Sequence, residues 1–234
     1  MPLVIFLGYL IGSVPFALFL ARQFGGADLR HIGSGNLGAA NVLRTSGVKA
    51  GILVAALDIA KGAASVLLAI RLSPDAAAPA AAGLAAIIGH VYPAWLRFRG
   101  GKGVATACGV FLVLAPRAVL PTVGVFVLTV WATRYVSFGS VLASLVLPAT
   151  AYATGSPRPA VIVACAAAAL ILFRHHSNFM RWLAGTERRL GGREASAALA
   201  RATVRVRGAA TLSQAPVAGS RSGEDVRPRE HGEE

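Results

Sequence analysis

Long apolar runs separated by short polar segments follow one another along most of the chain. Most of these runs approach the roughly 17–25 residues that a helix needs to cross a bilayer. We therefore predict membrane-spanning helices over Leu3–Ala21, Gly51–Leu72, Pro79–Leu96, Phe138–Thr154 and Pro159–Phe173, and within one longer run, Val104–Thr133.

The longer run exceeds the length of a single span that is not strongly tilted. It is interrupted by Ala115-Pro116-Arg117. Proline ends a helix and arginine prefers the membrane–water interface, so we predict two short spans here. The pattern thus predicts an all-α integral membrane protein with about seven transmembrane helices and structured cytoplasmic loops.

The composition supports a membrane protein and argues against a soluble domain. Of the 234 residues, 55% are hydrophobic and only 14% are charged, against roughly 25% charged in a typical soluble domain. The mean hydropathy is +0.62. The first run has no basic segment before it and no convincing cleavage site after it, so we expect it to be kept as a span.

Lysine and arginine are distributed unevenly between the two sets of alternate loops. One set holds Arg71, Arg117 and Arg158, and the other holds Arg22, Arg30, Arg44, Lys49, Arg97, Arg99, Lys102 and Arg134. Because basic loops stay in the cytoplasm, we expect the N-terminus outside and the C-terminus inside. We also expect a membrane domain of residues 1–191 followed by a disordered cytoplasmic tail over 192–234.

The formal net charge of +13 points to anionic partners. The basic residues lie between membrane spans, so we expect the lipid bilayer and anionic substrates as partners rather than nucleic acid. Cys108 and Cys165 lie inside apolar runs, and the chain has no H-E-x-x-H segment. We therefore expect neither a metal site nor a cofactor.

The first basic loop reads HIGSGNLGAANVLRTSG from His31. Glycines allow a ligand to approach the backbone closely, and successive N–H groups can form an anion-binding nest. Arg44 can add bidentate contacts to a phosphate. A flexible linker is the alternative, against which stands the mixture of polar residues with apolar Leu37, Val42 and Leu43.

The second basic loop reads HVYPAWLRFRGGKGVAT from His90. Lys102 lies between Gly101 and Gly103, directly before a predicted helix, and the N-terminus of a helix favours anions. The loop lacks the first glycine and the hydroxyl residue of a Walker A motif, so it does not indicate a nucleotide site. For His90 alone, a structural role is the simpler interpretation.

Charged and polar residues also occur outside these two loops, within or at the start of predicted spans. Asp58 and Lys61 share a face of the second span, where a structural ion pair and a substrate contact are both open. Ser137 and Ser140 begin a span, where helix capping is the alternative to a site role.

A last polar segment follows the final apolar run. His175 and Asn178 stand three residues apart there, and Glu187 comes soon after them. A histidine and an asparagine at this spacing at a helix end can hold a substrate.

Taken in order, these segments read GSGNLGAANVLRTSG, D-x-x-K-G, G-H-x-x-P…F-x-G-G-K-G-V-A-T, R-Y-V-S-x-x-S and H-x-x-N-…-G-x-E. With this order and spacing, the chain resembles the bacterial acyl-phosphate-dependent glycerol-3-phosphate acyltransferases from about Val4 to Arg189. The resemblance implies seven spans in the bacterial cytoplasmic membrane and an active site on the cytoplasmic side. It also implies transfer of an acyl group from acyl phosphate to the 1-hydroxyl of glycerol 3-phosphate, giving lysophosphatidic acid and phosphate.

The resemblance also implies roles for individual residues. It places catalytic functions at Ser34, Arg44, Lys102, Ser140, His175 and Asn178. It places substrate binding at Gly35, Asn36, Gly38, Asn41, Asp58, Lys61, His90, Gly101, Gly103, Thr106, Ser137 and Glu187. Two positions depart from the family pattern, since Leu37 stands where proline is common and Ala40 where threonine is common.

Acyl phosphate is a mixed anhydride with a good leaving group, so positioning and charge stabilisation can supply most of the acceleration. We expect direct transfer, with His175 or a substrate phosphate oxygen accepting the hydroxyl proton. An acyl-serine at Ser34 would need a nearby base, and the local sequence offers none. The competing hypotheses are a small-anion transporter, which usually has midplane sites and inverted repeats, and a non-catalytic membrane scaffold.

Overall fold

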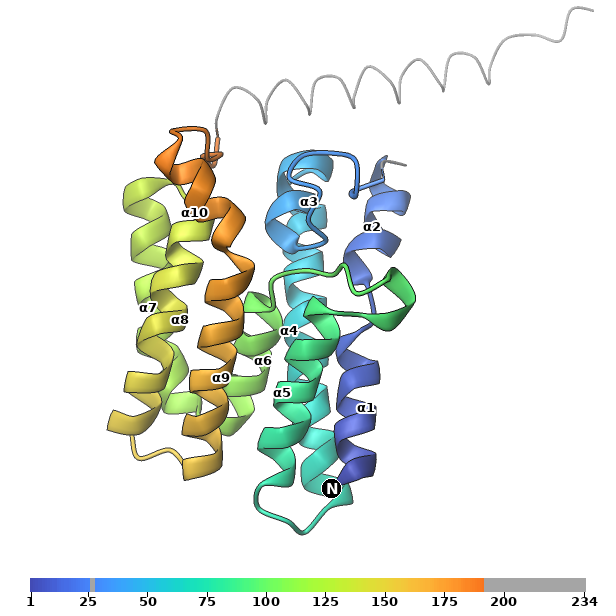
Figure 1. Ribbon diagram of the computed structural model, residues 1–234, viewed down its shortest axis with the longest axis vertical. Helices are drawn as coiled ribbons and strands as arrows, with labels where there is room; N and C mark the ends of the chain where they lie inside the picture. Colours follow the sequence, from blue (N-terminus) through green and yellow to red (C-terminus); the bar gives the residue numbers. More distant parts are fainter. Residues whose placement is uncertain (26–27, 192–234) are drawn as a thin grey trace, which may run out of the picture.

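The computed structural model describes residues 1–25 and 28–191, and the regular elements there are helices (Figure 1). The predicted disordered tail, 192–234, lies outside the described residues. The helices are α1 (Pro2–Gly12), α2 (Phe16–Gly25), α3 (Ala39–Ser46), α4 (Val48–Leu72), α5 (Ala78–Val91), the 3₁₀ turn η1 (Ala94–Leu96), α6 (Val104–Leu114), α7 (Pro116–Thr133), α8 (Val136–Ala153), α9 (Arg158–Arg174) and α10 (His176–Leu183).

The first predicted span is interrupted, because α1 and α2 are separated at residues 13–15. Pro15 lacks an N–H group and cannot continue the α-helical hydrogen-bond pattern. The break leaves two carbonyl groups available to partners from other elements. Trp95 Nε1 donates to the Ser13 carbonyl at 2.9 Å, and Lys61 Nζ donates to the Val14 carbonyl at 2.9 Å.

The predicted division of the long apolar run is confirmed, since α6 ends at Leu114 and α7 begins at Pro116. The number of spans is a separate matter. By length and composition, the described residues contain five spanning helices, or six if α9 and α10, which bend by 48°, form one span. The 11 residues of α6 extend about 16 Å, roughly half the hydrocarbon thickness. The count of seven therefore stays a prediction.

Small residues allow the helices to pack closely. A side chain at Gly62 of α4 would overlap the Thr106 carbonyl of α6, and a side chain at Gly109 of α6 would overlap the Ile59 carbonyl of α4. Such contacts between backbones are typical of helix pairs in membranes, where apolar burial provides little drive for association. The two glycines thus fix how α6 lies against α4.

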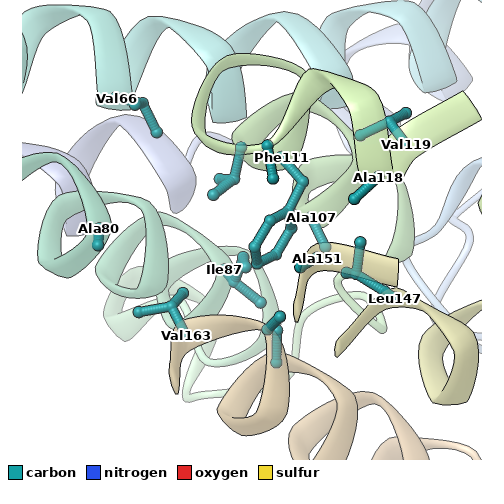
Figure 2. Packing of buried hydrophobic residues seen from close by; sticks show 14 of the residues in the cluster. Val66, Ala80, Ile87, Ala107, Phe111, Ala118, Val119, Leu147, Ala151 and Val163 are labelled. Atoms are coloured by element: carbon teal, nitrogen blue, oxygen red, sulfur yellow. The ribbon is translucent and has the colours of Figure 1, made fainter. Parts of the chain in front are cut away.

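The main hydrophobic core surrounds α6 (Figure 2). Phe111 is fully buried at its centre, with Val66 of α4, Ile87 of α5, Leu147 of α8 and Val163 of α9 in the same cluster. The short helix is therefore enclosed by longer neighbours on several sides. This position fixes the start of α6, where the second glycine-rich loop ends.

Large apolar side chains also point outward. Leu120, Trp131 and Tyr152 are 78%, 81% and 79% exposed, as expected of side chains that face lipid. In Figure 1, α3, α10 and the turn between α7 and α8 lie at the end of the bundle opposite the N-terminus. The second basic loop, between α5 and α6, lies about halfway along the bundle (Figure 1). The predicted orientation in the membrane therefore stays a prediction.

Candidate active site

Lys102 is positioned by the glycines on either side of it. Gly103 precedes α6 with φ +86°, a left-handed conformation that other residues adopt at a cost. The Gly101 N–H donates to the His90 carbonyl at 3.1 Å, and a side chain at Gly101 would overlap the His90 ring. The loop therefore lies tightly on the end of α5, and Lys102 projects from a rigid backbone at the N-terminus of α6.

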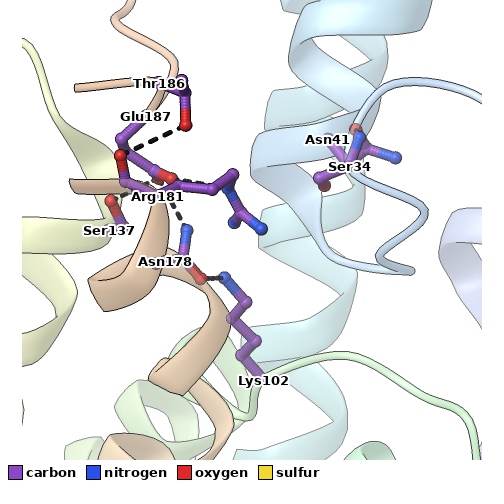
Figure 3. A network of polar contacts seen from close by, with 8 residues as sticks. All are labelled: Ser34, Asn41, Lys102, Ser137, Asn178, Arg181, Thr186 and Glu187. Carbon is purple, nitrogen blue, oxygen red and sulfur yellow. Dashed lines mark hydrogen bonds and ion pairs between the residues drawn. The ribbon is translucent and has the colours of Figure 1, made fainter. Parts of the chain in front are cut away.

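A chain of polar contacts runs from Lys102 to the C-terminal segment (Figure 3). Lys102 Nζ donates to Asn178 Oδ1. Asn178 Nδ2 in turn donates to Glu187 Oε1 at 2.6 Å, and Ser137 Oγ donates to the same oxygen at 2.7 Å. Arg181 Nε donates to Glu187 Oε2 at 2.8 Å. The chain joins the second loop, the start of α8, helix α10 and the segment after it.

Several cationic side chains surround this series of hydrogen bonds. Burial lowers the pKa of Lys102 to about 8; Glu187 acts to raise it, and three guanidinium groups, those of Arg181, Arg44 and Arg174, act to lower it. The pKa of Arg44 is also lowered, mainly by burial. Cations held together in a partly buried place repel one another, so a bound anion would stabilise the group.

Glu187 is the carboxylate within this cluster that acts on both Lys102 and Arg44. Burial alone would raise the pKa of Glu187, but hydrogen bonds donated by Ser137, Asn178 and Arg181 outweigh it and hold the pKa below its usual value. Glu187 is thus an anion at neutral pH. One carboxylate cannot neutralise the cations around it, and the cluster keeps a positive excess.

The first loop is organised by Asn41 of α3, which is buried. Its Oδ1 accepts the Ser34 N–H at 2.9 Å, and its Nδ2 donates to the carbonyls of Ile32 at 3.1 Å and Asn36 at 3.0 Å. These bonds hold the glycine-rich backbone in one conformation. In Figure 3, Ser34 and Asn41 lie apart from the Lys102 chain; Arg44, also on α3, is the residue of this region whose charge interacts with Glu187 and Arg181.

Asp58, Lys61 and His90 form a second buried group beneath the second loop. Lys61 Nζ lies 2.8 Å from Asp58 Oδ1, and His90 Nδ1 lies 3.5 Å from the same oxygen. A crevice between the α1–α2 break and the second loop reaches this group, with Val14, Leu37 and Gly101 in its lining. Lys61 connects α4 to the break through its hydrogen bond to the Val14 carbonyl. His90 connects the group to the second loop, because its carbonyl accepts the Gly101 N–H.

His175 and Ser140 are both buried near the site. His175 Nδ1 lies 2.8 Å from the Ile171 carbonyl. A carbonyl only accepts hydrogen bonds, so Nδ1 carries the hydrogen and Nε2 of the neutral ring is the proton acceptor. Ser140 Oγ donates to the Val136 carbonyl of its own helix at 2.9 Å, which leaves the oxygen lone pairs available.

Three buried donor atoms around the site have no hydrogen-bond partner among the described residues. They are Arg44 Nε, Thr106 Oγ1 and Arg174 Nε. Buried donors without partners are costly, and their presence often marks a place where a ligand supplies the acceptors. Thr106 lies in the first turn of α6, where N–H groups without intrahelical acceptors also favour anions. The arrangement is suited to binding a multiply charged oxyanion.

Comparison with known proteins now identifies the family. A protein-family model described as Glycerol-3-phosphate acyltransferase matches residues 2–185. A glycerol-3-phosphate acyltransferase from Syntrophotalea carbinolica is 48% identical over 183 residues, which are 77% of this chain and 93% of that protein. The chain belongs to the glycerol-3-phosphate acyltransferase family. The resemblance seen in the loop motifs is confirmed, and the protein is an acyltransferase.

Solved structures extend the likeness of this acyltransferase to the fold. It is similar to PlsY (YgiH), an integral membrane glycerol 3-phosphate acyltransferase, in its glycerol 3-phosphate form, with 38% identity and a TM-score of 0.76 over 81% of this chain and 94% of that one. The lysophosphatidic acid form gives 37% identity and a TM-score of 0.75 over 82% and 96%. The prediction of an all-helical, multi-pass membrane protein is confirmed.

The acyltransferase brings together many of the residues predicted for its site. Lys102, Asn178, Glu187 and Ser137 are joined by hydrogen bonds, and Arg44 interacts with them through charge. The other predicted residues lie in four places. Ser34, Gly35, Asn36, Gly38 and Asn41 belong to the first loop and the start of α3; Gly101, Gly103 and Thr106 lie around the start of α6; Asp58, Lys61 and His90 form the second buried group; and Ser140 and His175 lie in α8 and between α9 and α10. Their individual roles stay predictions.

Two arginines that the sequence did not single out belong to the same place. Arg174 Nη2 donates to the Gly101 carbonyl at 3.5 Å, and its guanidinium lies 5.4 Å from the centre of the Tyr92 ring. Arg181 pairs with Glu187 at 2.8 Å. Both flank the H-x-x-N segment, one residue before His175 and three after Asn178. That proximity to the H-x-x-N segment was the signal available in the sequence.

Proposed function

We propose that this acyltransferase moves an acyl group from acyl phosphate to the 1-hydroxyl of glycerol 3-phosphate, giving lysophosphatidic acid and inorganic phosphate. The observation that carries the proposal is the cluster of Lys102, Arg44, Arg174 and Arg181 around one carboxylate. Each substrate brings a phosphate, and the donor also has a lipid tail. A cationic site within a lipid-exposed helical bundle suits both properties.

Lys102 is well suited to the leaving phosphate. Its pKa of about 8 means that the ammonium ion is charged at neutral pH although burial disfavours that charge. Binding a phosphate would compensate for this burial and would place the ammonium where negative charge develops in the transition state. Arg44 offers the planar donor pattern that fits two phosphate oxygens.

The transfer itself needs few steps. The 1-hydroxyl oxygen attacks the carbonyl carbon of acyl phosphate, the new ester C–O bond forms, and the bond from that carbon to the phosphate oxygen breaks. The hydroxyl proton passes to Nε2 of His175 or to an oxygen of a substrate phosphate, and it leaves with the phosphate product. No covalent acyl-enzyme is required.

We place the reaction at the cytoplasmic face of the bacterial inner membrane, with the N-terminus outside. The distribution of lysine and arginine in the sequence supports this orientation. Helix α3, which carries Arg44, and the α7–α8 turn, which carries Arg134, lie at the end of the bundle opposite the N-terminus, and the second loop lies about halfway along it (Figure 1). Water-soluble glycerol 3-phosphate would reach the site from the cytoplasm. The acyl donor and the lysophosphatidic acid product would remain associated with the membrane through their chains.

A donor comparison tests the proposal. Purified protein in detergent is given glycerol 3-phosphate with either acyl phosphate or an acyl thioester of the same chain length, and lysophosphatidic acid is measured. We expect product with acyl phosphate and little with the thioester. Product formed only from the thioester would contradict the donor assignment, and folded protein that forms no product from either would favour the anion-transporter alternative.

A further inference from the structure

Three hydrogen bonds from the protein hold the carboxylate of Glu187. Ser137 Oγ and Asn178 Nδ2 both donate to Oε1, at 2.7 and 2.6 Å, and Arg181 Nε donates to Oε2 at 2.8 Å. The Glu187 side chain is 7% exposed. A carboxylate held in this way has no donor to offer a phosphate, and its charge would repel one. Direct contact with a substrate phosphate is therefore not its function.

The bond to Glu187 determines which way the Asn178 amide faces. An asparagine amide has one donor side and one acceptor side. Because Nδ2 donates to the carboxylate, Oδ1 is directed to the opposite side, where it accepts the hydrogen bond from Lys102. If the Asn178 amide were rotated by half a turn, its NH₂ group would face the ammonium ion of Lys102. Both groups are donors, so no hydrogen bond could form between them. Glu187 thus orients Lys102 through Asn178.

Lys102 is also surrounded by charged groups from several elements. Arg44 of α3, Arg174 at the end of α9 and Arg181 of α10 act on it as cations, and its charge also acts on His175. Glu187 opposes them, since it raises the pKa of Lys102 while the three arginines lower it. Without this negative charge, the surrounding cations would favour the neutral amine.

We propose that Glu187 is a positioning residue with two effects. It orients the Asn178 amide so that its oxygen faces Lys102, and its negative charge offsets the surrounding cations so that Lys102 binds phosphate as an ammonium ion. The kinetic part of this inference rests on the proposed function. The charge balance around Lys102 does not, because it can be measured without any reaction.

The kinetic test uses Glu187→Gln, which keeps the shape and removes the charge. We expect kcat/KM for glycerol 3-phosphate to fall on the alkaline side near pH 8 in the unsubstituted protein. In Glu187→Gln the fall should move to lower pH by roughly half a unit to one unit. Ser137→Ala, which removes one bond to the carboxylate but keeps its charge, should leave the position of the fall unchanged. An equal loss at every pH in Glu187→Gln would indicate a purely structural residue and overturn the proposal.

A direct titration separates this inference from the proposed function. The chain has three lysines, Lys49, Lys61 and Lys102, so ¹³C-methylated lysines can be followed individually by NMR in the full-length protein. The Lys102 signal, identified by its absence in Lys102→Arg, should titrate near pH 8 and at lower pH in Glu187→Gln. Identical midpoints would overturn the proposal. A shifted midpoint in a protein without acyl transfer would overturn the proposed function alone.

A second variant keeps the test decisive if Glu187→Gln does not fold. Arg181→Gln removes one of the cations that act on Lys102 and keeps the carboxylate. The Lys102 titration should then move to higher pH. An unchanged midpoint would show that the charges around Lys102 do not control its protonation, and the proposal would fail.

Discussion

Lys102 and Asn178 are 76 residues apart in sequence, yet the ammonium group of one donates a hydrogen bond to the amide oxygen of the other. Lys102 comes from the loop before α6, and Asn178 comes from α10 beyond the last long helix. The contact joins two motifs that have no relationship along the chain. Through this hydrogen bond the second loop and the C-terminal segment form one site.

Replacing Lys102 should abolish most activity without unfolding the protein. In Lys102→Ala the phosphate loses an ammonium partner in the transition state, and we expect kcat/KM to fall by about 10²–10³-fold. Lys49→Ala is the matched control, because Lys49 is an exposed lysine at the start of α4. Initial rates of lysophosphatidic acid formation measure both variants. Near-normal turnover of Lys102→Ala would remove Lys102 from the mechanism.

The pH dependence follows from the direction of the Lys102 shift. Burial lowers the pKa of Lys102 to about 8, so the charged form is present below this pH and is lost as the pH rises through it. If the ammonium ion binds phosphate, activity should decrease over the same range. The measurement is kcat/KM for glycerol 3-phosphate on both sides of pH 8, with corrections for spontaneous hydrolysis of acyl phosphate. Activity that is constant through this range would contradict the role.

The sequence predicted much of the site because the motifs are local. Glycines around Lys102, and the polar residues of the first loop, are visible as short segments between apolar runs. The short helices α3 and α10 were not predicted, since neither is a long apolar run. The alternation of apolar and polar residues within these segments was the available signal. A prediction based on the length of apolar runs does not detect it.

Contacts between residues far apart in the sequence could not be predicted, because they depend on how separate elements pack. Which side of the Asn178 amide faces Lys102 depends on Glu187, which in turn depends on Ser137 and Arg181 from separate elements. The break between α1 and α2 was also missed, because the apolar run continues through Pro15 without a change in hydropathy. Only the packed structure shows that the Val14 carbonyl there accepts a hydrogen bond from Lys61.

Breaking the buried ion pair should destabilise the protein. Removing Asp58 leaves Lys61 as an uncompensated buried charge, and breaking such a pair typically costs about 3–5 kcal/mol. We expect Asp58→Ala to unfold at a clearly lower temperature in detergent. The double variant Asp58→Leu with Lys61→Met, which removes both charges, should recover part of the loss. If the double variant is no more stable than Asp58→Ala, the unpaired charge of Lys61 is not the cause of the loss.

Close packing of α4 and α6 gives a prediction with a matched control. A methyl group at Gly109 would overlap the Ile59 carbonyl, whereas a methyl group at Gly124 of α7 meets no atom within 4 Å. Gly109→Ala should therefore lower the thermal unfolding midpoint in detergent. Gly124→Ala should leave the midpoint unchanged or raise it slightly, because alanine favours helix more than glycine. Equal midpoints for the two variants would contradict the packing of these helices.

If the proposed function is right, one cationic site transfers an acyl group from acyl phosphate to glycerol 3-phosphate. The most direct measurement is a ³¹P NMR time course on the purified full-length protein supplied with acyl phosphate and glycerol 3-phosphate. We predict that the signals of lysophosphatidic acid and inorganic phosphate grow in equal amounts while both substrates decline together. Growth of inorganic phosphate while glycerol 3-phosphate stays constant would contradict the account, because it would show hydrolysis of the donor instead of transfer.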